Sequence, residues 1–253
     1  MEVLFFLLVF AVGAAVGSFL NVLIDRLPRG ESILFKKSHC ANCGRILHLQ
    51  ELVPILSYLW LRGKCKYCKA KISIRLLIVE IATALLFLSI FAFYYFAKIS
   101  FSDAIFLALV LSSFLCIFFS DLEYGIIPDE VVIFLLGVIT LYTFFAVPAE
   151  ITNRFFASLA TTGSFLFLFI ITRGRGIGFG DVKLSPVLGL FLGFPKIIIG
   201  VYAAFLTGAA VSLILIAMGK KKFKNDTIPF GPFLAIGAIL GYFFGIRILD
   251  LFL

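Results

Sequence analysis

Long apolar runs fill most of this chain, and short polar segments separate them, with one longer polar stretch near the N-terminus. The runs are continuous rather than alternating, which favours helices over strands. A helix needs about 20 mainly apolar residues to cross a bilayer. The pattern therefore predicts an all-α polytopic membrane protein with about eight transmembrane helices, the sixth of them short: residues 2–24, 74–97, 104–120, 129–147, 153–172, 181–195, 197–218 and 230–250.

Composition supports this class. Hydrophobic residues make up 62% of the 253 positions and charged residues 14%, which is more apolar surface than a soluble domain of this length can bury. The first apolar run has no basic segment ahead of it, and basic residues follow it instead. We therefore expect a retained first helix rather than a cleaved signal peptide.

The distribution of basic residues predicts the orientation. Most of them fall in segment 25–73 and in the other connections assigned to the same side, which carry Arg173, Arg175, Lys183, Lys220, Lys221, Lys222 and Lys224. The positive-inside rule then places both termini outside and segment 25–73 in the cytoplasm. This topology accounts for the net charge of +8, which is therefore no argument for a nucleic-acid partner. We predict three parts: a first helix at 1–24, an insertion at 25–73 and a membrane core at 74–253.

The insertion carries two C-x2-C pairs, Cys40 with Cys43 and Cys65 with Cys68. Four thiolates at this spacing are typical of a closed, structural zinc site, and a segment this short needs such a metal to fold. A cytoplasmic location argues against two disulfides. The alternative is a set of redox-active or unrelated thiols.

Two acidic residues lie at the margins of apolar runs. Asp121 ends the third run, where the helix dipole disfavours a negative charge, and Asp181 begins the sixth run, directly after a loop that contains Gly178 and Gly180. Both emerge on the predicted cytoplasmic side. Two close carboxylates share a proton, so one can deprotonate water while the other hydrogen-bonds a scissile carbonyl. The alternatives are an interfacial acid at Asp121 and a helix cap at Asp181. For Asp129, which follows Pro128, a capping role is favoured over catalysis.

Taken in order, the motifs resemble those of the bacterial type IV prepilin peptidases, over nearly the whole chain. They are Gly17-Ser18-Phe19-Leu20-Asn21-Val22, the two cysteine pairs, Asp121 with Ile127-Pro128-Asp129, Gly178-Phe179-Gly180-Asp181-Val182-Lys183-Leu184, and Pro229-Phe230-Gly231-Pro232-Phe233-Leu234-Ala235. The glycine-flanked aspartate alone would also fit presenilin-like proteases.

The resemblance implies an aspartic endopeptidase of the bacterial inner membrane with Asp121 and Asp181 as its catalytic pair. Gly178, Gly180 and Lys183 would support the catalytic loop. The implied substrates are prepilins and pseudopilins of type IV pilus and type II secretion systems, cleaved after a glycine on the cytoplasmic face. The family then methylates the new N-terminus with S-adenosylmethionine. The sequence predicts neither the particular prepilins nor the oligomeric state.

The methyl-donor site is predicted at Ser18, Asn21 and Glu80. Ser18 and Asn21 share one face of the first helix with Asp25, and Glu80 lies about two turns into the second helix, where Arg75 is a candidate partner. Helix packing explains these residues equally well. Gly13 and Gly17 form a G-x-x-x-G motif that lets another helix approach closely. Family features absent here are a proline after the first cysteine, where Ala41 stands, and a tryptophan between the cysteine pairs.

Two other classes of protein compete with this interpretation. A proton-coupled transporter would relay protons through membrane carboxylates, near the midplane and on broken helices. A membrane-anchored zinc-ribbon scaffold would explain the cysteines but not the glycine-flanked Asp181.

Overall fold

The computed structural model describes residues 2–33, 35, 37–97, 99–219 and 228–252, and the side chains of all of these except 2, 97 and 252. Lys220, Lys221, Lys222 and Lys224, which contributed to the predicted orientation, lie outside this range. The chain divides into two compact units, unit 1 at Met1–Cys116 and unit 2 at Ile117–Leu253, with the boundary inside one helix. This division does not test the predicted parts 1–24, 25–73 and 74–253, which stay predictions.

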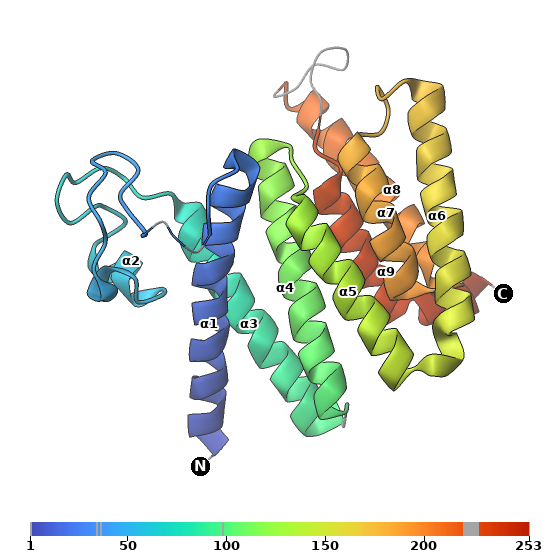
Figure 1. Ribbon diagram of the computed structural model, residues 1–253, viewed down its shortest axis with the longest axis horizontal. Helices are drawn as coiled ribbons and strands as arrows, with labels where there is room; N and C mark the ends of the chain where they lie inside the picture. Colours follow the sequence, from blue (N-terminus) through green and yellow to red (C-terminus); the bar gives the residue numbers. More distant parts are fainter. Residues whose placement is uncertain (1, 34, 36, 98, 220–227, 253) are drawn as a thin grey trace. The chain divides into compact units, whose positions relative to one another are not determined.

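The regular secondary structure of the described residues is helical (Figure 1). Within the described part of the chain, seven helices are long and apolar enough to cross a membrane, which confirms the predicted all-α multi-pass class. They are α1 (Glu2–Arg26), α3 (Ile74–Ala97), α4 (Phe101–Tyr124), α5 (Asp129–Ala146), α6 (Ile151–Thr172), α8 (Lys196–Ala217) and α9 (Gly231–Phe252). The sixth predicted span forms α7 (Phe179–Leu192), whose 14 residues are fewer than a full crossing needs.

Close packing of α1 against α3 organises unit 1. A Cβ on Gly17 would lie 2.7 Å from the Cα of Glu80, and a Cβ on Gly13 would lie 2.8 Å from the Cα of Ala84. Real Cβ contacts are longer, so glycine is required at both positions. This confirms the predicted role of the G-x-x-x-G motif.

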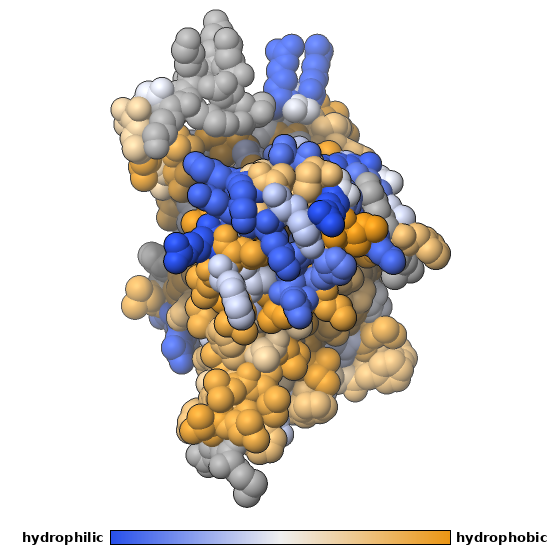
Figure 2. Space-filling model, turned by 90° about the vertical axis from the view of Figure 1, so that its left-hand side faces the viewer, coloured by the Kyte–Doolittle hydropathy of each residue, from blue (hydrophilic) through white to orange (hydrophobic). Residues whose placement is uncertain are grey.

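The polar insertion joins α1 to α3 and contains short helical segments only: η1 (Leu27–Arg29), η2 (Leu49–Glu51) and α2 (Leu56–Trp60). Two isolated antiparallel bridges, His39 with Ile46 and Lys64 with Lys71, close two loops. Figure 2 shows hydrophilic side chains gathered over this insertion and hydrophobic ones over the helices below it. Unit 1 therefore has the surface of a polar cap on a membrane helix pair.

In unit 2 the short helix α7 contacts α5, α6, α8 and α9. Its buried residues lie on all sides of the helix and include Leu184, Val187, Leu188 and Phe191. A helix that is apolar all round belongs in the interior of a bundle. Gly189 allows the closest approach, because a Cβ there would collide with the backbone of Ser158 on α6. The surrounding helices thus fix the position of the N-terminus of α7, where Asp181 lies.

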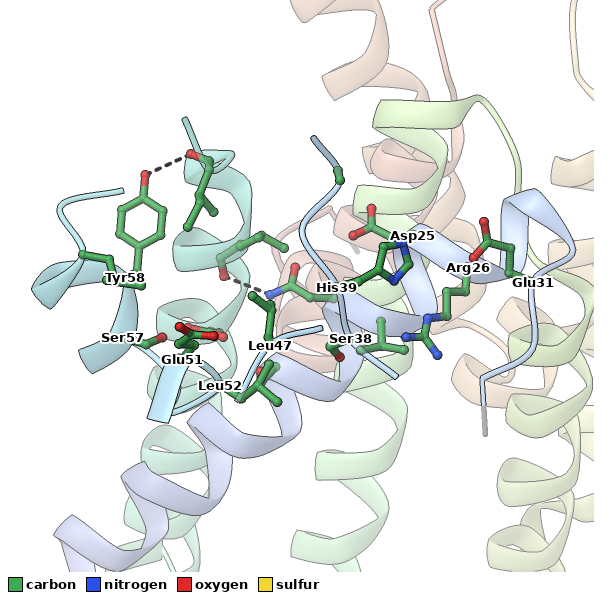
Figure 3. A pocket seen from close by; sticks show the side chains of 18 of the residues that line it. Asp25, Arg26, Glu31, Ser38, His39, Leu47, Glu51, Leu52, Ser57 and Tyr58 are labelled. Carbon is green, nitrogen blue, oxygen red and sulfur yellow. Dashed lines mark hydrogen bonds between the residues drawn. The ribbon is translucent and has the colours of Figure 1, made fainter. Parts of the chain in front are cut away.

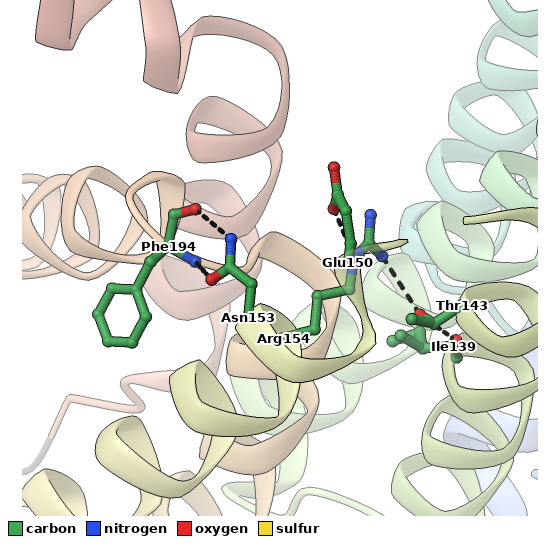
Figure 4. Close-up of polar contacts among 6 residues, drawn as sticks. All are labelled: Ile139, Thr143, Glu150, Asn153, Arg154 and Phe194. Carbon is green, nitrogen blue, oxygen red and sulfur yellow. Dashed lines mark hydrogen bonds and ion pairs between the residues drawn. The ribbon is translucent and has the colours of Figure 1, made fainter. Parts of the chain in front are cut away.

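Polar contacts tie the helix ends of unit 2 together (Figure 4). Asn153 near the start of α6 donates to the carbonyl oxygen of Phe194 at 2.9 Å and accepts from its N–H at 2.9 Å. Arg154 is buried, pairs with Glu150 at 2.9 Å, and donates to the hydroxyl of Thr143 on α5 at 3.4 Å. These bonds anchor α6 to α5 and to the loop between α7 and α8.

Candidate functional site

Asp121 and Asp181 line one cavity of about 600 Å³ in unit 2. Asp121 lies in the last turn of α4, and Asp181 lies in the first turn of α7. Each residue is only 6% exposed. The remaining walls combine loop glycines with apolar side chains: Leu122, Gly125, Ile127, Gly174, Arg175, Gly176, Ile177, Gly178, Gly180, Ser212, Ile216, Ile228, Pro229 and Phe230. The structure therefore brings the two predicted acids together.

Asp121 is held from the start of α9. The backbone N–H of Gly231 donates to its Oδ2 at 2.8 Å. A Cβ on Gly231 would lie 2.7 Å from the same oxygen, so only glycine lets the backbone reach the carboxylate. This contact spans 110 residues of sequence, and the sequence analysis did not identify Gly231 as the donor.

Asp181 is held by its own loop. The N–H of Gly178 donates to its Oδ2 at 3.1 Å, so the predicted capping role is present at the N-terminus of α7. Gly180 packs against Ile127, to which a Cβ would make an ordinary contact at 3.4 Å. The charge of Asp121 acts on Asp181 electrostatically. Two buried carboxylates that influence each other in this way favour a state in which one proton is shared.

Lys183, two residues after Asp181, does not line the cavity. Its Nζ pairs with Oδ1 of Asp129 at 2.7 Å and lies 5.2 Å from the ring centroid of Phe179. Asp129 is in the first turn of α5, where the helix dipole stabilises its negative charge. The pair ties the start of α5 to the start of α7. Glu123 is exposed in the last turn of α4.

The four cysteines of the insertion converge. Their Sγ atoms all lie within 4.8 Å of one another, and those of Cys40 and Cys68 are 3.9 Å apart. Four thiolates around one Zn²⁺ at about 2.3 Å would be about 3.8 Å apart. The cluster therefore fits a tetrahedral zinc ion. The N–H of Ala70 and the side-chain amide of Asn42 lower the pKa of the Cys68 thiol to about 6, whereas desolvation and the neighbouring thiols raise the pKa of Cys43 to about 11.

The two cysteine loops share one backbone feature. The residue after the second cysteine has a left-handed conformation in both, with φ of +68° at Gly44 and +57° at Lys69. Glycine adopts this conformation without strain, whereas lysine does not. Each loop closes with N–H groups bonded back to the first cysteine, from Gly44 to Cys40 at 2.9 Å and from Lys69 to Cys65 at 3.1 Å.

A second cavity of about 260 Å³ lies in unit 1 (Figure 3). It is lined by Ser18, Asn21 and Glu80, the residues predicted to hold a methyl donor, and by Asp25 from the same face of α1. The expected pairing of Arg75 with Glu80 is wrong. Arg75 instead binds Oδ1 of Asp25 at 2.7 Å, because α1 presents that acid to the start of α3. The sequence analysis also missed Glu51, which lines this cavity from the insertion.

The fold and the first cavity define an α-helical multi-pass membrane protein with a paired-aspartate site between helix ends. The sequence model of the family described as "Type IV leader peptidase family" matches residues 108–213, which include both aspartates. A second model, described as "Bacterial Peptidase A24 N-terminal domain", matches residues 11–94, which include the cysteine cluster and the residues that line the second cavity.

Similar full-length proteins carry the name prepilin leader peptidase/N-methyltransferase. One from Bacillus subtilis (strain 168) is 32% identical, over 97% of this chain and 97% of the relative. One from Dichelobacter nodosus is 33% identical over 94% and 91%, and one from Burkholderia pseudomallei (strain 1026b) is 32% identical over 94% and 85%. The chain belongs to the type IV leader peptidase family, which confirms the predicted peptidase and methyltransferase class. No solved structure is significantly similar to it.

Proposed function

We propose that this protein is a membrane aspartic endopeptidase that removes the leader peptides of type IV prepilins and pseudopilins. Cleavage follows a glycine at the cytoplasmic face of the bacterial inner membrane, and Asp121 and Asp181 are its catalytic residues. The new N-terminus is then methylated with S-adenosylmethionine as donor. The relatives named above support the substrate class.

One observation carries the peptidase mechanism: two buried carboxylates share a cavity, and each is oriented by a single backbone N–H. Each carboxylate keeps an oxygen that these bonds do not use. With one proton between them, the ionised member takes a proton from water while the protonated member donates to the scissile carbonyl. The water oxygen bonds to the carbonyl carbon, the C–N bond breaks, and the amine leaves with a proton.

The cavity walls suit the beginning of a hydrophobic helix. Ile127, Ile177, Ile216 and Phe230 line the cavity together with the aspartates. Apolar walls exclude bulk water and strengthen the interactions of the carboxylates. Gly178, Gly180 and the Lys183–Asp129 pair set the position of Asp181 on α7.

The cysteine cluster has a structural role in this proposal. Cys40, Cys43, Cys65 and Cys68 would hold one Zn²⁺, which closes both loops of an insertion that has little regular structure of its own. All four coordination positions are protein thiolates, so the metal would order the insertion rather than activate water.

The test is cleavage of a purified prepilin by the full-length protein in detergent, with products identified by mass spectrometry. Asp121→Asn and Asp181→Asn keep the side-chain size and should each abolish cleavage. Glu123→Gln, which removes an exposed acid from the same turn as Asp121, should cleave as the wild type does. Cleavage at the wild-type rate by either aspartate variant would disprove the assignment.

The transporter alternative gains no support from the positions of the acids. Asp121 is in the last turn of its helix and Asp181 is in the first turn of its own, so neither lies on the middle of a broken transmembrane helix.

A further inference from the structure

The cavity of unit 1 contains a buried carboxylate with no positive partner. Glu80 is 9% exposed, and none of the ion pairs among the described residues includes it. Its hydrogen-bond partners are neutral: the N–H of Ile55 at 2.7 Å and the side chain of Ser18. Two other acids of the cavity differ, since Asp25 pairs with Arg75 and Oε1 of Glu51 lies 3.8 Å from Nζ of Lys66.

An unpartnered polar atom lies in the same cavity. Asn21 is 5% exposed, and its side-chain N–H group donates to the carbonyl oxygen of Leu76 at 2.9 Å. That bond fixes the amide on α1, and its Oδ1 then has no hydrogen-bond partner within the described part of the chain. A buried acceptor without a partner costs about 1–3 kcal/mol unless a ligand or water satisfies it.

We propose, on the basis of the function above, that this cavity binds the methyl donor, with Glu80 facing its positive charge and Asn21 Oδ1 accepting one of its hydrogen bonds. S-adenosylmethionine suits such a cavity because it carries a sulfonium and an ammonium group, together with amine and hydroxyl donors. When bound, it supplies a methyl group on a positively charged sulfur. A buried carboxylate without a counterion is stabilised when a positively charged ligand binds beside it.

The remaining walls fit the same ligand class. Four acids line the cavity, Asp25, Glu31, Glu51 and Glu80, and Arg26 and Arg29 contribute positive charge for a carboxylate. The N–H of His48 keeps the pKa of Glu51 below its usual range, so that wall is anionic at neutral pH. A volume of about 260 Å³ lies just below the roughly 300–1,000 Å³ found for small-molecule sites. A cavity of this size leaves no room for a substrate helix beside a cofactor.

The experiment measures binding of S-adenosylmethionine to full-length protein in detergent by isothermal titration calorimetry, with prepilin cleavage assayed on the same samples. Glu80→Gln keeps an acceptor for Ile55 and removes the charge. Affinity should fall about ten- to 150-fold, the range for a hydrogen bond to a charged group, while cleavage stays within about twofold. Glu130→Gln removes an exposed acid that lines neither cavity and should leave both measurements unchanged.

A comparison of ligands separates a charge contact from a general effect on the fold. S-adenosylhomocysteine lacks the methyl group and the sulfonium charge. If Glu80 faces that charge, Glu80→Gln should weaken the binding of S-adenosylmethionine by a larger factor than that of S-adenosylhomocysteine. An equal loss for both ligands would contradict the placement of Glu80. Asn21→Leu, a second variant of similar side-chain size, should lower the affinity for both ligands and leave the cleavage rate unchanged.

The outcomes also separate this inference from the proposed function. If wild-type protein binds the donor and both variants bind it equally well, the cavity is not the site, whereas the methyltransferase function stands. If wild-type protein cleaves prepilin but neither binds the donor nor methylates the product, the methyltransferase part of the proposed function fails. If the aspartate variants cleave normally, the peptidase assignment fails, whatever the cavity binds.

Discussion

Gly231→Ala should disable cleavage although it adds a single methyl group far from Asp121 in sequence. The new Cβ would lie 2.7 Å from Oδ2 and 3.1 Å from Cγ of Asp121, whereas ordinary contacts begin near 3.4 Å. The carboxylate must therefore move by about 0.5 Å or more, and the 2.8 Å bond from the Gly231 N–H must lengthen or break. Because a misplacement of about 1 Å costs about a hundredfold in rate, the shift alone is large enough to matter.

A hydrogen bond to a charged group is worth about 1.5–3 kcal/mol, which corresponds to about a ten- to 150-fold change in rate. We expect the cleavage rate of Gly231→Ala to fall by about this factor. The assay is single-turnover cleavage of a prepilin, followed by mass spectrometry, so that product release does not mask the chemical step. Binding of S-adenosylmethionine should be unchanged, because every residue that lines the proposed donor site, the cavity of about 260 Å³, belongs to unit 1.

Gly137→Ala is the matched control. Gly137 lies inside α5, and a Cβ there would meet nothing within 4 Å. Alanine is favoured over glycine in a helix by about 1 kcal/mol, so this variant should be slightly more stable and fully active. If Gly231→Ala cleaves at the wild-type rate while Asp121→Asn is inactive, the Gly231 N–H does not position the carboxylate, and the argument is refuted.

Three further predictions concern the insertion and the helix ends. Purified protein should contain about one zinc per chain, which elemental analysis measures. Removal of the zinc with a chelator should lower the affinity for S-adenosylmethionine, because His39 and Ala41 of the first cysteine loop line the proposed donor site. The cleavage rate should not change, and calorimetry and the cleavage assay test both points. Lys69→Gly should slow the loss of zinc to a chelator, because glycine relieves about 1–2 kcal/mol of backbone strain at this left-handed position. Faster zinc release from the variant would contradict this prediction. Asn153→Ala should lose two hydrogen bonds to Phe194, about 1–3 kcal/mol together, and lower the thermal midpoint in detergent with cleavage intact below it.

The sequence predicted the helices well because a membrane helix is specified by length and apolarity alone. The second predicted span, 74–97, coincides with α3, and 129–147 differs from α5 by one residue. The sixth did not follow this rule. Its start was predicted at residue 181, but α7 begins at Phe179, because Gly178 can serve as the N-cap and the Asp181 side chain bonds back to it. Local hydrogen bonding, which hydropathy does not report, set that boundary.

The site residues divide in the same way. Asp121 and Asp181 were recognisable as candidates because a charge beside an apolar run has few structural explanations. The N–H of Gly231 was not, because a backbone donor has no residue-specific signal and this contact depends on how α9 packs in unit 2. The mistaken pairing of Arg75 with Glu80 has a related cause. Spacing along one helix suggested it, whereas the actual partner, Asp25, comes from the neighbouring helix α1.

The short length of α7 links this protein to the thickness of its lipid environment. Fourteen residues rise about 21 Å, while the hydrocarbon core is about 30 Å thick. The Gly174–Gly178 segment ahead of α7 lines the cavity that contains Asp181, and irregular backbone inside a bilayer is tolerated only within protein or along a water-filled space. A short α7 beside such a cavity makes the protein sensitive to mismatch with the bilayer. On the proposed function, we expect the acyl-chain length of the lipids to change the rate of cleavage.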